Sequence, residues 1–255
     1  MTTISTALQP GKTAIIVGAS SGIGAALARR LAREGYRVAL LARRAEALAA
    51  VCEQINAEGG ERARAYPHDA TDTGAAPELF QTILRDLGGI GLVVYCAGRQ
   101  LPVALNEYDF AKDEAMLEAN LLGAVAWLNQ AALLFERLGQ GQIVGISSIA
   151  GERGRVGSPV YNTSKAALNT YLEALRNRLT RRGVNVLTVR PGFVQTELLK
   201  NSPRTFWVIS PEQAADDIWR AIRARKQVVF TPARWRLVAL GLRHVPSVLF
   251  RRMSF

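Results

Sequence analysis

The chain has 255 residues, of which 49% are hydrophobic and 21% charged, and its net charge is +11 at pH 7. These values are typical of one large folded domain and argue against disorder. There is no secretory signal and no apolar run that could span a bilayer, so we expect a cytoplasmic protein. We also expect neither nucleic acid nor metal, because the arginines match no nucleic-acid-binding signature and Cys52 and Cys96 have no second ligand at zinc-site spacing.

Short apolar segments alternate with helical ones along most of the chain. The predicted strands are residues 13–18, 36–42, 63–69, 91–98, 141–148, 184–192 and 227–232. The predicted helices are residues 22–35, 44–59, 74–88, 112–139, a helix that begins near Pro159, and residues 210–225. This alternation predicts a single α/β domain with a doubly wound parallel sheet of the Rossmann type. We expect its core at about residues 12–231, followed by a basic amphipathic tail at about 232–255.

A glycine-rich turn joins the first predicted strand to the first predicted helix. Gly18, Gly22 and Gly24 have the spacing G-x3-G-x-G. Glycines at such a place permit a tight turn and let a pyrophosphate approach the unpaired N–H groups of the helix N-terminus. Glycine is also common at ordinary helix entries, so it is the position in the alternating series that favours a dinucleotide site.

The residues after the second strand bear on which dinucleotide is used. Enzymes that prefer NAD generally carry an acidic residue there, which accepts the ribose 2′-hydroxyl and repels a 2′-phosphate. In this chain Ala42 is followed by Arg43 and Arg44, whose guanidinium groups could grip a phosphate. The alternative is that both arginines only begin a solvated helix. We expect NADP(H), with Arg43 as the main contact and the Ser21 hydroxyl assisting.

Tyr161 and Lys165 lie four residues apart in a segment predicted to be helical, so they share a helix face. An ammonium close to a phenol favours the phenolate and lowers the pKa of the phenol toward the range of an acid/base catalyst. Such a pair can also occur on a solvated helix face. Its meaning therefore depends on the site around it.

The glycine spacing and the Tyr-x3-Lys pair together resemble the short-chain dehydrogenase/reductase family, over about residues 12–231 and with further motifs in the family's order. The resemblance implies adenine contacts at Asp69 and nicotinamide contacts in the segment after the sixth strand. The full set of expected cofactor-binding residues is Gly18, Ser20, Ser21, Gly22, Ile23, Gly24, Arg43, Arg44, Asp69, Ala70, Ala97, Gly98, Tyr161, Lys165, Pro191, Gly192, Val194 and Thr196.

The resemblance also implies carbonyl reduction, with Tyr161 as proton donor, Ser148 steadying the carbonyl oxygen and Lys165 acting on both the phenol and the nicotinamide ribose. Ser148 is chosen over Ser147 because the family's serine stands thirteen residues before its tyrosine, and Ser147 is then a packed hydroxyl on the other face of the strand. Asn120 would support a water that passes protons to Lys165. Its alternative role is an amide that satisfies backbone groups at a helix kink.

Several positions are less standard. Val17 and the pair Tyr95–Cys96 replace a Thr and an Asn-Asn pair that the family usually carries, so hydrogen bonds at the base of the cofactor site are expected to be missing or replaced. The segment of residues 197–210 matches the family's variable substrate lid. Apolar residues 206–208 in it favour a bulky apolar ketone or alcohol, or else pack against the domain.

The tail carries Trp235, Val238, Leu242 and Val245 at helical spacing, interspersed with arginines. The tail could anchor the protein on anionic lipid, or it could cover a neighbouring subunit and its substrate pocket. We favour the second alternative because the apolar segments are short. We expect a homodimer or homotetramer, as is common in the family. The rival functions are a non-catalytic NADP-binding sensor or scaffold and a membrane-surface protein that acts through the tail.

Overall fold

The computed structural model describes residues 11–201 and 205–253. Residues 1–10, which are predicted to carry no secretory signal, lie outside this range. Three residues of the expected lid and the last two residues of the tail lie outside it as well.

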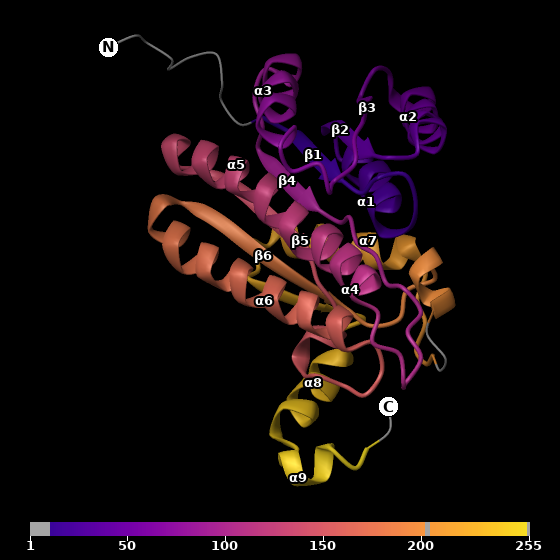
Figure 1. Cartoon of the computed structure of the whole chain (residues 1–255). Coiled ribbons are helices and arrows are strands. Elements are labelled where there is room, and N and C mark those ends of the chain that lie inside the picture. Colours follow the sequence, from indigo (N-terminus) through magenta and orange to yellow (C-terminus); the bar gives the residue numbers. More distant parts are fainter. Residues whose placement is uncertain (1–10, 202–204, 254–255) are drawn as a thin grey trace.

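The described chain contains a seven-stranded parallel sheet with the order β3-β2-β1-β4-β5-β6-β7 (Figure 1). Its strands are β1 (Thr13–Val17), β2 (Arg37–Ala42), β3 (Ala63–Pro67), β4 (Leu92–Tyr95), β5 (Gly141–Ile146), β6 (Val184–Pro191) and β7 (Val228–Thr231). The strand order reverses between β1 and β4. In open sheets of this kind, a ligand crevice lies outside the carboxyl ends of the strands at that reversal.

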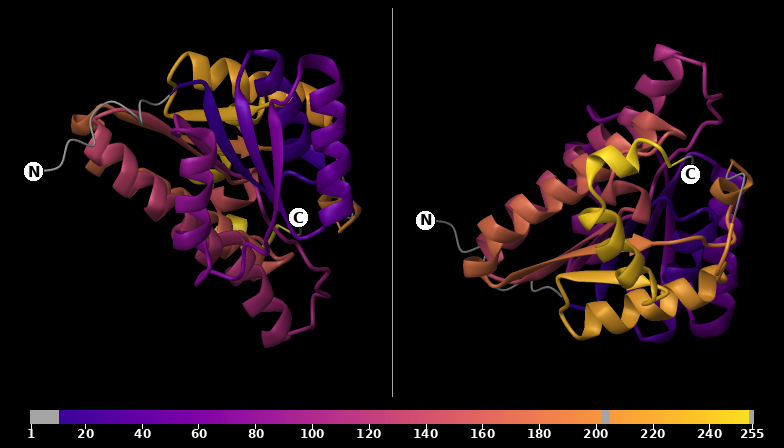
Figure 2. Two further views of the ribbon diagram at one scale, coloured as in Figure 1. Left: turned by 90° about the horizontal axis from the view of Figure 1, so that it is seen from above. Right: turned by 90° about the horizontal axis from the view of Figure 1, so that it is seen from below.

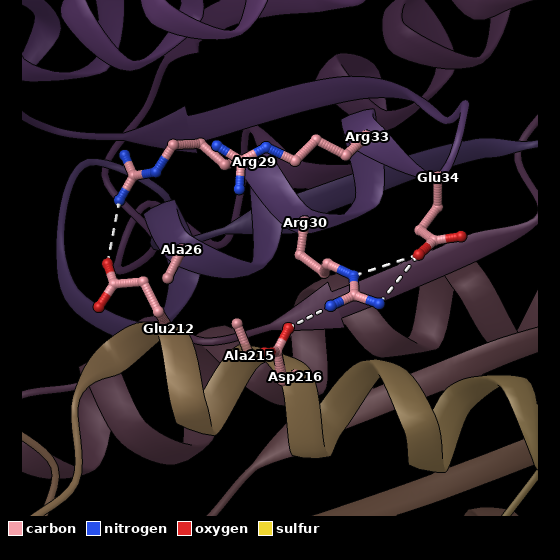
Figure 3. A pocket seen from close by; sticks show the side chains of 8 residues that line it. All are labelled: Ala26, Arg29, Arg30, Arg33, Glu34, Glu212, Ala215 and Asp216. Atoms are coloured by element: carbon pink, nitrogen blue, oxygen red, sulfur yellow. Dashed lines mark hydrogen bonds and ion pairs between the residues drawn. The ribbon is translucent and has the colours of Figure 1, made fainter.

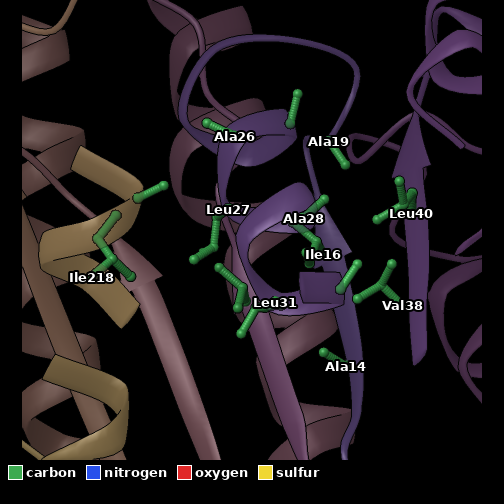
Figure 4. Close-up of a cluster of buried hydrophobic side chains, with 14 of the residues drawn as sticks. Ala14, Ile16, Ala19, Ala26, Leu27, Ala28, Leu31, Val38, Leu40 and Ile218 are labelled. Atoms are coloured by element: carbon green, nitrogen blue, oxygen red, sulfur yellow. The ribbon is translucent and has the colours of Figure 1, made fainter. Parts of the chain in front are cut away.

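Helices cover both faces of the sheet (Figure 2). Side chains of α1 (Gly22–Arg33), α2 (Ala45–Gly59) and α7 (Pro211–Arg223) pack on one face, and those of α3 (Ala76–Leu87), α5 (Gly123–Leu138) and α6 (Pro159–Leu179) on the other. Alternate residues of β1 enter the two cores: Ile16 meets Leu27 and Leu31 of α1 (Figure 4), whereas Ile15 faces the opposite layer. The predicted doubly wound α/β fold is confirmed.

The long helix predicted at residues 112–139 is interrupted in the structure. It consists of α4 (Phe110–Leu117), a π-helical turn at Glu118–Leu122 and then α5. The turn contains the fully buried Asn120, whose side chain bonds to the backbone of Arg99 in the loop after β4. A π-turn adds a residue to the helical turn, and such turns are often found at functional sites.

After β7 the chain forms α8 (Trp235–His244) and α9 (Ser247–Phe250), drawn in yellow in Figure 1. Trp235 and Ala239 of α8 are buried against Ile149, with Val238 partly buried beside them. The predicted helical stripe thus packs on the domain of its own chain. None of the described helices is both long and apolar enough to cross a lipid bilayer.

Candidate active site

A cavity of about 560 Å³ lies between α1 and α7 (Figure 3). Its charged side chains are paired: Arg30 with Glu34 at 2.9 Å and with Asp216, and Arg29 with Glu212 at 3.7 Å. The remaining guanidinium, on Arg33, bonds to Glu58 at 3.0 Å. This cavity therefore belongs to the contact between two helices, and the chemistry must be sought at the carboxyl ends of the strands.

In the glycine-rich turn between β1 and α1, two of the glycines have no room for a side chain. Gly18 has a φ of 91°, and a Cβ there would collide with the backbone of Ala97. A Cβ on Gly24 would overlap the carbonyl of Gly18. The N-cap residue Ser21 makes no side-chain cap, so the first N–H groups of α1 are not claimed by it. These residues fit a pyrophosphate held by backbone N–H groups at a helix N-terminus.

Beyond this turn, it is Arg44 that reaches the glycine-rich segment. Its Nη2 donates to the hydroxyls of Ser20 at 3.1 Å and Ser21 at 2.6 Å. Arg43, the main contact expected from the sequence, lies instead 3.8 Å from the carboxylate of Asp69. Burial favours the neutral form of Asp69, but hydrogen bonds from Thr71 and the charge of Arg43 outweigh it and lower the pKa of this carboxyl.

The unusual residues of β4 supply their own hydrogen bond at the base of this site. The hydroxyl of the buried Tyr95 donates to the carbonyl of Ala119 at 2.6 Å. Gly123 makes room for this contact, because a Cβ there would collide with the phenol oxygen and with the carbonyl of Ala70. Tyr95 thus ties β4 to the π-helical turn through its own side chain.

The helix α6 begins at Pro159 and brings Tyr161 and Lys165 to the end of β5. The Lys165 ammonium lies 5.9 Å from the centre of the Tyr161 ring, and its Nζ donates to the carbonyl of Ile146 at 3.1 Å. Ser148 follows β5, and its side chain interacts with the Tyr161 phenol and opposes the rise in the pKa of that phenol. Ser147 donates to the carbonyl of Lys165 at 3.1 Å and is buried, as its interpretation as a packed hydroxyl requires. Three groups of the predicted catalytic set are thus brought together.

The pKa values of Tyr161 and Lys165 differ from those of the free side chains. Burial raises the pKa of Tyr161, and the hydrogen bond with Ser148 and the charge of Arg155 only partly oppose it, so the expected net lowering is not seen. Burial also lowers the pKa of Lys165 to about 8. At neutral pH the phenol is therefore protonated, which suits a proton donor, and the amine is still mainly charged.

Asn120 is fully occupied as a donor. Its Nδ2 donates to the carbonyl of Arg99 and to the hydroxyl of Ser164, both at 2.9 Å, and its Oδ1 accepts from the N–H of Arg99 at 2.7 Å. This is the role of an amide that satisfies backbone groups at a helix interruption. A Cβ on Gly98 would lie 3.1 Å from Asn120 Oδ1 and 3.4 Å from Lys165 Nζ, so both side chains border the same residue. The water relay stays a prediction.

The expected nicotinamide segment leaves β6 at Pro191 and turns back over the glycine-rich turn. Gly192 donates its N–H to Thr231 of β7 at 2.9 Å. The Thr196 Cγ2 lies so near Gly22 that a Cβ added to Gly22 would be only 2.9 Å away. Val194 is buried with the partly buried Ile23 beside it. The segments that follow β1 and β6 are therefore in direct contact.

Four aromatic rings gather beside this segment. Trp235 of α8 lies 5.6 Å from Phe193 and 5.1 Å from Phe206 between ring centres, and Trp207 is 5.7 Å from Trp235. Trp235 is 3% exposed, whereas Phe206 and Trp207 remain 50% and 44% exposed. Phe206 and Trp207 thus pack against the domain and also present apolar surface next to the crevice.

Two residues near the site were missed by the sequence reasoning. Glu152 is fully buried four residues after Ser148 and binds Arg190 of β6 at 3.0 Å and Arg243 of α8 at 2.6 Å. Arg155 lies in the loop before α6 and interacts electrostatically with Tyr161. The only local signal was the charged run between Ser148 and Tyr161, and nothing in that run says which residues face the tyrosine.

The chain matches known proteins over most of its length. A sequence profile of the short chain dehydrogenase family matches residues 12–206. The chain is 31% identical over 218 residues to the ketoacyl reductase HetN of Nostoc sp., covering 84% of this chain and 76% of that protein. It is 33% identical over 239 residues to an uncharacterized oxidoreductase of Mycobacterium tuberculosis, covering 94% and 96% of the two chains.

Solved structures show the same fold. The bulky-bulky ketone specific alcohol dehydrogenase from Comamonas testosteroni superposes with a TM-score of 0.79 at 23% identity, covering 96% of each chain. A short-chain type dehydrogenase/reductase from Mycobacterium ulcerans gives a TM-score of 0.76 at 24% identity, covering 88% of this chain and 89% of that one.

Proposed function

The chain belongs to the short-chain dehydrogenase family, and from that premise we propose that it is an NADP(H)-dependent oxidoreductase (EC 1.1.1.-) that interconverts a ketone or aldehyde and its alcohol. The observation that carries the proposal is the meeting of Ser148, Tyr161 and Lys165 at the carboxyl end of β5. A non-catalytic sensor would have no chemical need for all three groups. Similarity to a ketoacyl reductase also favours carbonyl reduction.

Each of the three residues has a distinct part in this reaction. The Tyr161 phenol would give its proton to the carbonyl oxygen as negative charge develops there. The Ser148 hydroxyl would donate a hydrogen bond to the same oxygen. The Lys165 ammonium would stabilise the phenolate left behind and bind the nicotinamide ribose. A bound nicotinamide supplies the hydride.

The choice of NADP(H) is supported by charge. Ala42 brings no carboxylate to repel a 2′-phosphate, while Arg44 lies on the Ser20 and Ser21 hydroxyls and Arg43 is close by. A guanidinium and two hydroxyls form a donor set for phosphate oxygens.

A bulky apolar portion of the substrate is supported by the aromatic rings of Phe206 and Trp207. They are half-exposed beside the segment that follows β6. Burying such rings against an apolar ligand is favourable.

We further propose a cytoplasmic homodimer or homotetramer. Two exposed apolar side chains, Leu122 at the end of the π-helical turn and Leu133 on α5, offer surface for a second copy. Leu237 and Leu240 on the outer side of α8 do so as well. The alternative partner of α8 is an anionic membrane surface.

The proposal is tested by mixing the purified protein with NADPH and a panel of aliphatic and aromatic ketones and aldehydes, and following the loss of NADPH absorbance. We expect turnover of at least one bulky apolar carbonyl compound. Tyr161→Phe should lower kcat by about 10²–10⁴-fold or more while NADPH still binds, because the proton donor is lost. Ser148→Ala should have a milder effect.

Tyr171→Phe is the matched control on the same helix. Its phenol bonds to Asn129 at 2.9 Å, away from the catalytic group, so its activity should stay near that of the parent. Binding of NADPH without turnover of any carbonyl compound would favour the sensor, and near-normal activity of Tyr161→Phe would overturn the catalytic assignment.

A further inference from the structure

The loop before α6 holds a guanidinium next to the catalytic tyrosine. Arg155 donates from Nη2 to the side-chain oxygen of Asn162 at 3.1 Å, with Nε at 3.4 Å from the same oxygen. Asn162 is 1% exposed and is itself fixed by a hydrogen bond to the carbonyl of Gly157 at 2.9 Å. Because Asn162 directly follows Tyr161 in the chain, this anchor sets the position of the guanidinium relative to the phenol.

Within the described part of the chain, no carboxylate pairs with the charge of Arg155. Among residues 11–201 and 205–253 it forms no ion pair, and its one side-chain acceptor is the neutral amide of Asn162. It is partly buried, and burial lowers its pKa, while its interaction with Tyr161 acts the other way. A partly desolvated cation without a counter-ion is unfavourable, so an anion supplied from outside would be stabilised there.

Arg155 is also one of the residues that line an open cavity of about 510 Å³ between the loop and the tail. The other lining residues are Arg153, Gly154 and Val156 from the loop and Ser247, Phe250 and Arg251 from the tail, and none of them is acidic. The cavity is therefore positively charged, and a large enough space is present for a substituent of a substrate.

Arg153 has a different task from Arg155. It donates to the carbonyls of Leu242 and Val245 and to the Ser247 hydroxyl, and its guanidinium lies 4.1 Å from the centre of the Phe250 ring. These contacts hold the tail against the loop and so build the wall of the cavity. Arg155 and Arg251 are left to meet a ligand.

We infer that the substrate carries an anionic group, a carboxylate or a phosphate ester, that Arg155 binds in this cavity, with Arg251 as a second cation. The inference rests on the proposed function and narrows its substrate class. A carbonyl oxygen at Tyr161 places the neighbouring part of the molecule within reach of Arg155, while the aromatic rings beside the β6 segment accommodate an apolar portion. The substrate is thus an amphipathic carbonyl compound with an anionic end.

The test uses matched aromatic ketones of increasing chain length, each ending in a carboxylate or in its methyl ester, and a second series ending in a phosphate monoester or in the free alcohol. The parent should favour the anionic member of a pair by about ten- to a hundredfold in kcat/KM, the value of one or two charge-assisted contacts. The series with the larger ratio identifies the anion. Arg155→Gln should bring the ratio near one.

Arg252→Gln is the matched control, because Arg252 follows Arg251 in the tail but does not line the cavity. It should keep the full preference, whereas a preference lost equally in both variants would indicate general attraction to a basic surface and overturn the inference.

Equilibrium binding separates this inference from the proposed function. The carboxylate-bearing alcohols are titrated calorimetrically into the NADP⁺ complex of the parent and of Arg155→Gln. Binding that is strong in the parent and at least tenfold weaker in the variant supports the anion site even if no ketone is turned over. Equal binding overturns it even if the neutral ketones are good substrates. If the only defect of the Arg155→Gln variant were weaker binding to anionic vesicles, Arg155 would be a lipid-binding residue. That result would likewise overturn the inference.

Discussion

Lys165 is an amine that is only 5% exposed, and its surroundings determine when it carries charge. Within the described residues its ammonium donates one hydrogen bond, to the carbonyl of Ile146, and burial lowers its pKa to about 8, opposed by Cys96. In the unfolded chain a lysine keeps its proton to about pH 10.4. Below pH 8 the buried ammonium lowers the free energy of unfolding by its full amount. This destabilisation disappears as the pH rises toward the pKa of Lys165 in the unfolded chain.

The free energy of unfolding should therefore contain a contribution from Lys165 that rises between pH 8 and pH 10.5, where the unfolded state binds more protons. Lys165→Met removes it, so the difference between parent and variant should shift in favour of the parent by about 2 kcal/mol from pH 7 to pH 10. Urea denaturation of the cofactor-free proteins measures this. Tyr161, Tyr95 and Cys96 have raised pKa values and act in the opposite direction, but they are present in both proteins. Parallel stability curves would show that the amine is not desolvated.

Arg44 is the residue on which cofactor choice should depend most, because its guanidinium already bonds to Ser20 and Ser21. Arg44→Ala should weaken NADPH binding about ten- to a hundredfold and leave NADH nearly unchanged, as expected for one charge-assisted phosphate contact. Arg43→Ala should have a smaller effect of the same kind, since Arg43 is turned toward Asp69.

Fluorescence titration with both cofactors makes the comparison. Arg37→Ala is the control, because Arg37 lies at the opposite end of β2 and bonds to the carbonyl of Asp86. Equal losses for NADPH and NADH in the Arg44 variant, or a parent that prefers NADH, would show that the end of β2 has been misread.

At the scale of elements, α8 is seated directly on the end of β6. A Cβ on Gly192 would overlap the indole of Trp235, so this glycine is needed for close approach of the helix. Glu152 adds a second link, because it binds both Arg190 of β6 and Arg243 of α8. The tail is thereby attached to the two segments that follow β5 and β6, which also carry the proposed catalytic serine and the expected nicotinamide contacts.

Gly192→Ala should destabilise the protein by about 1–3 kcal/mol, the usual cost of overpacking. In the background of Trp235→Ala, which itself should cost about 3–5 kcal/mol, the same substitution should cost much less. A double-mutant cycle by urea denaturation gives the coupling energy.

Gly241→Ala serves as the control for this cycle, since a Cβ on this residue of α8 meets open space. It should be neutral or should stabilise by about 0.5–1 kcal/mol through helix propensity. Additive effects of Gly192→Ala and Trp235→Ala would contradict the seating of α8 on β6.

At the scale of the whole molecule, the net charge of +11 and the exposed outer side of the tail raise the question of what the tail meets. Leu237, Leu240, Val248 and Leu249 are exposed, with arginines between them. The inward side of α8 is used by its own domain, so only this outer side is available. The apolar area is short and interrupted, which favours a second copy of the chain over stable anchoring in lipid.

We expect the protein to remain unbound when floated with vesicles containing anionic lipid, and to show a multiple of its chain mass in light scattering. Leu237→Asp with Leu240→Asp should shift the mass distribution toward smaller species and leave the thermal midpoint of the domain within a few degrees, because both side chains are exposed. Salt-sensitive binding of the parent to vesicles, lost in this double variant, would overturn the preference for subunit contact.

The sequence by itself determined the doubly wound fold and the glycine-rich turn, and it predicted that Tyr161 and Lys165 share a helix face, whereas Ser148 was predicted from the resemblance to the family. These depend on short-range patterns: strand and helix periodicity, glycine spacing, and positions that share a helix face. Only the tertiary structure decided that Arg44 reaches the serines, that Asn120 holds the loop after β4, and that burial raises the pKa of the Tyr161 phenol. It also brought Trp235 onto Gly192 and Arg155 beside Tyr161. These relations depend on side-chain direction, desolvation and contacts between distant segments, and none of the three is encoded by local spacing.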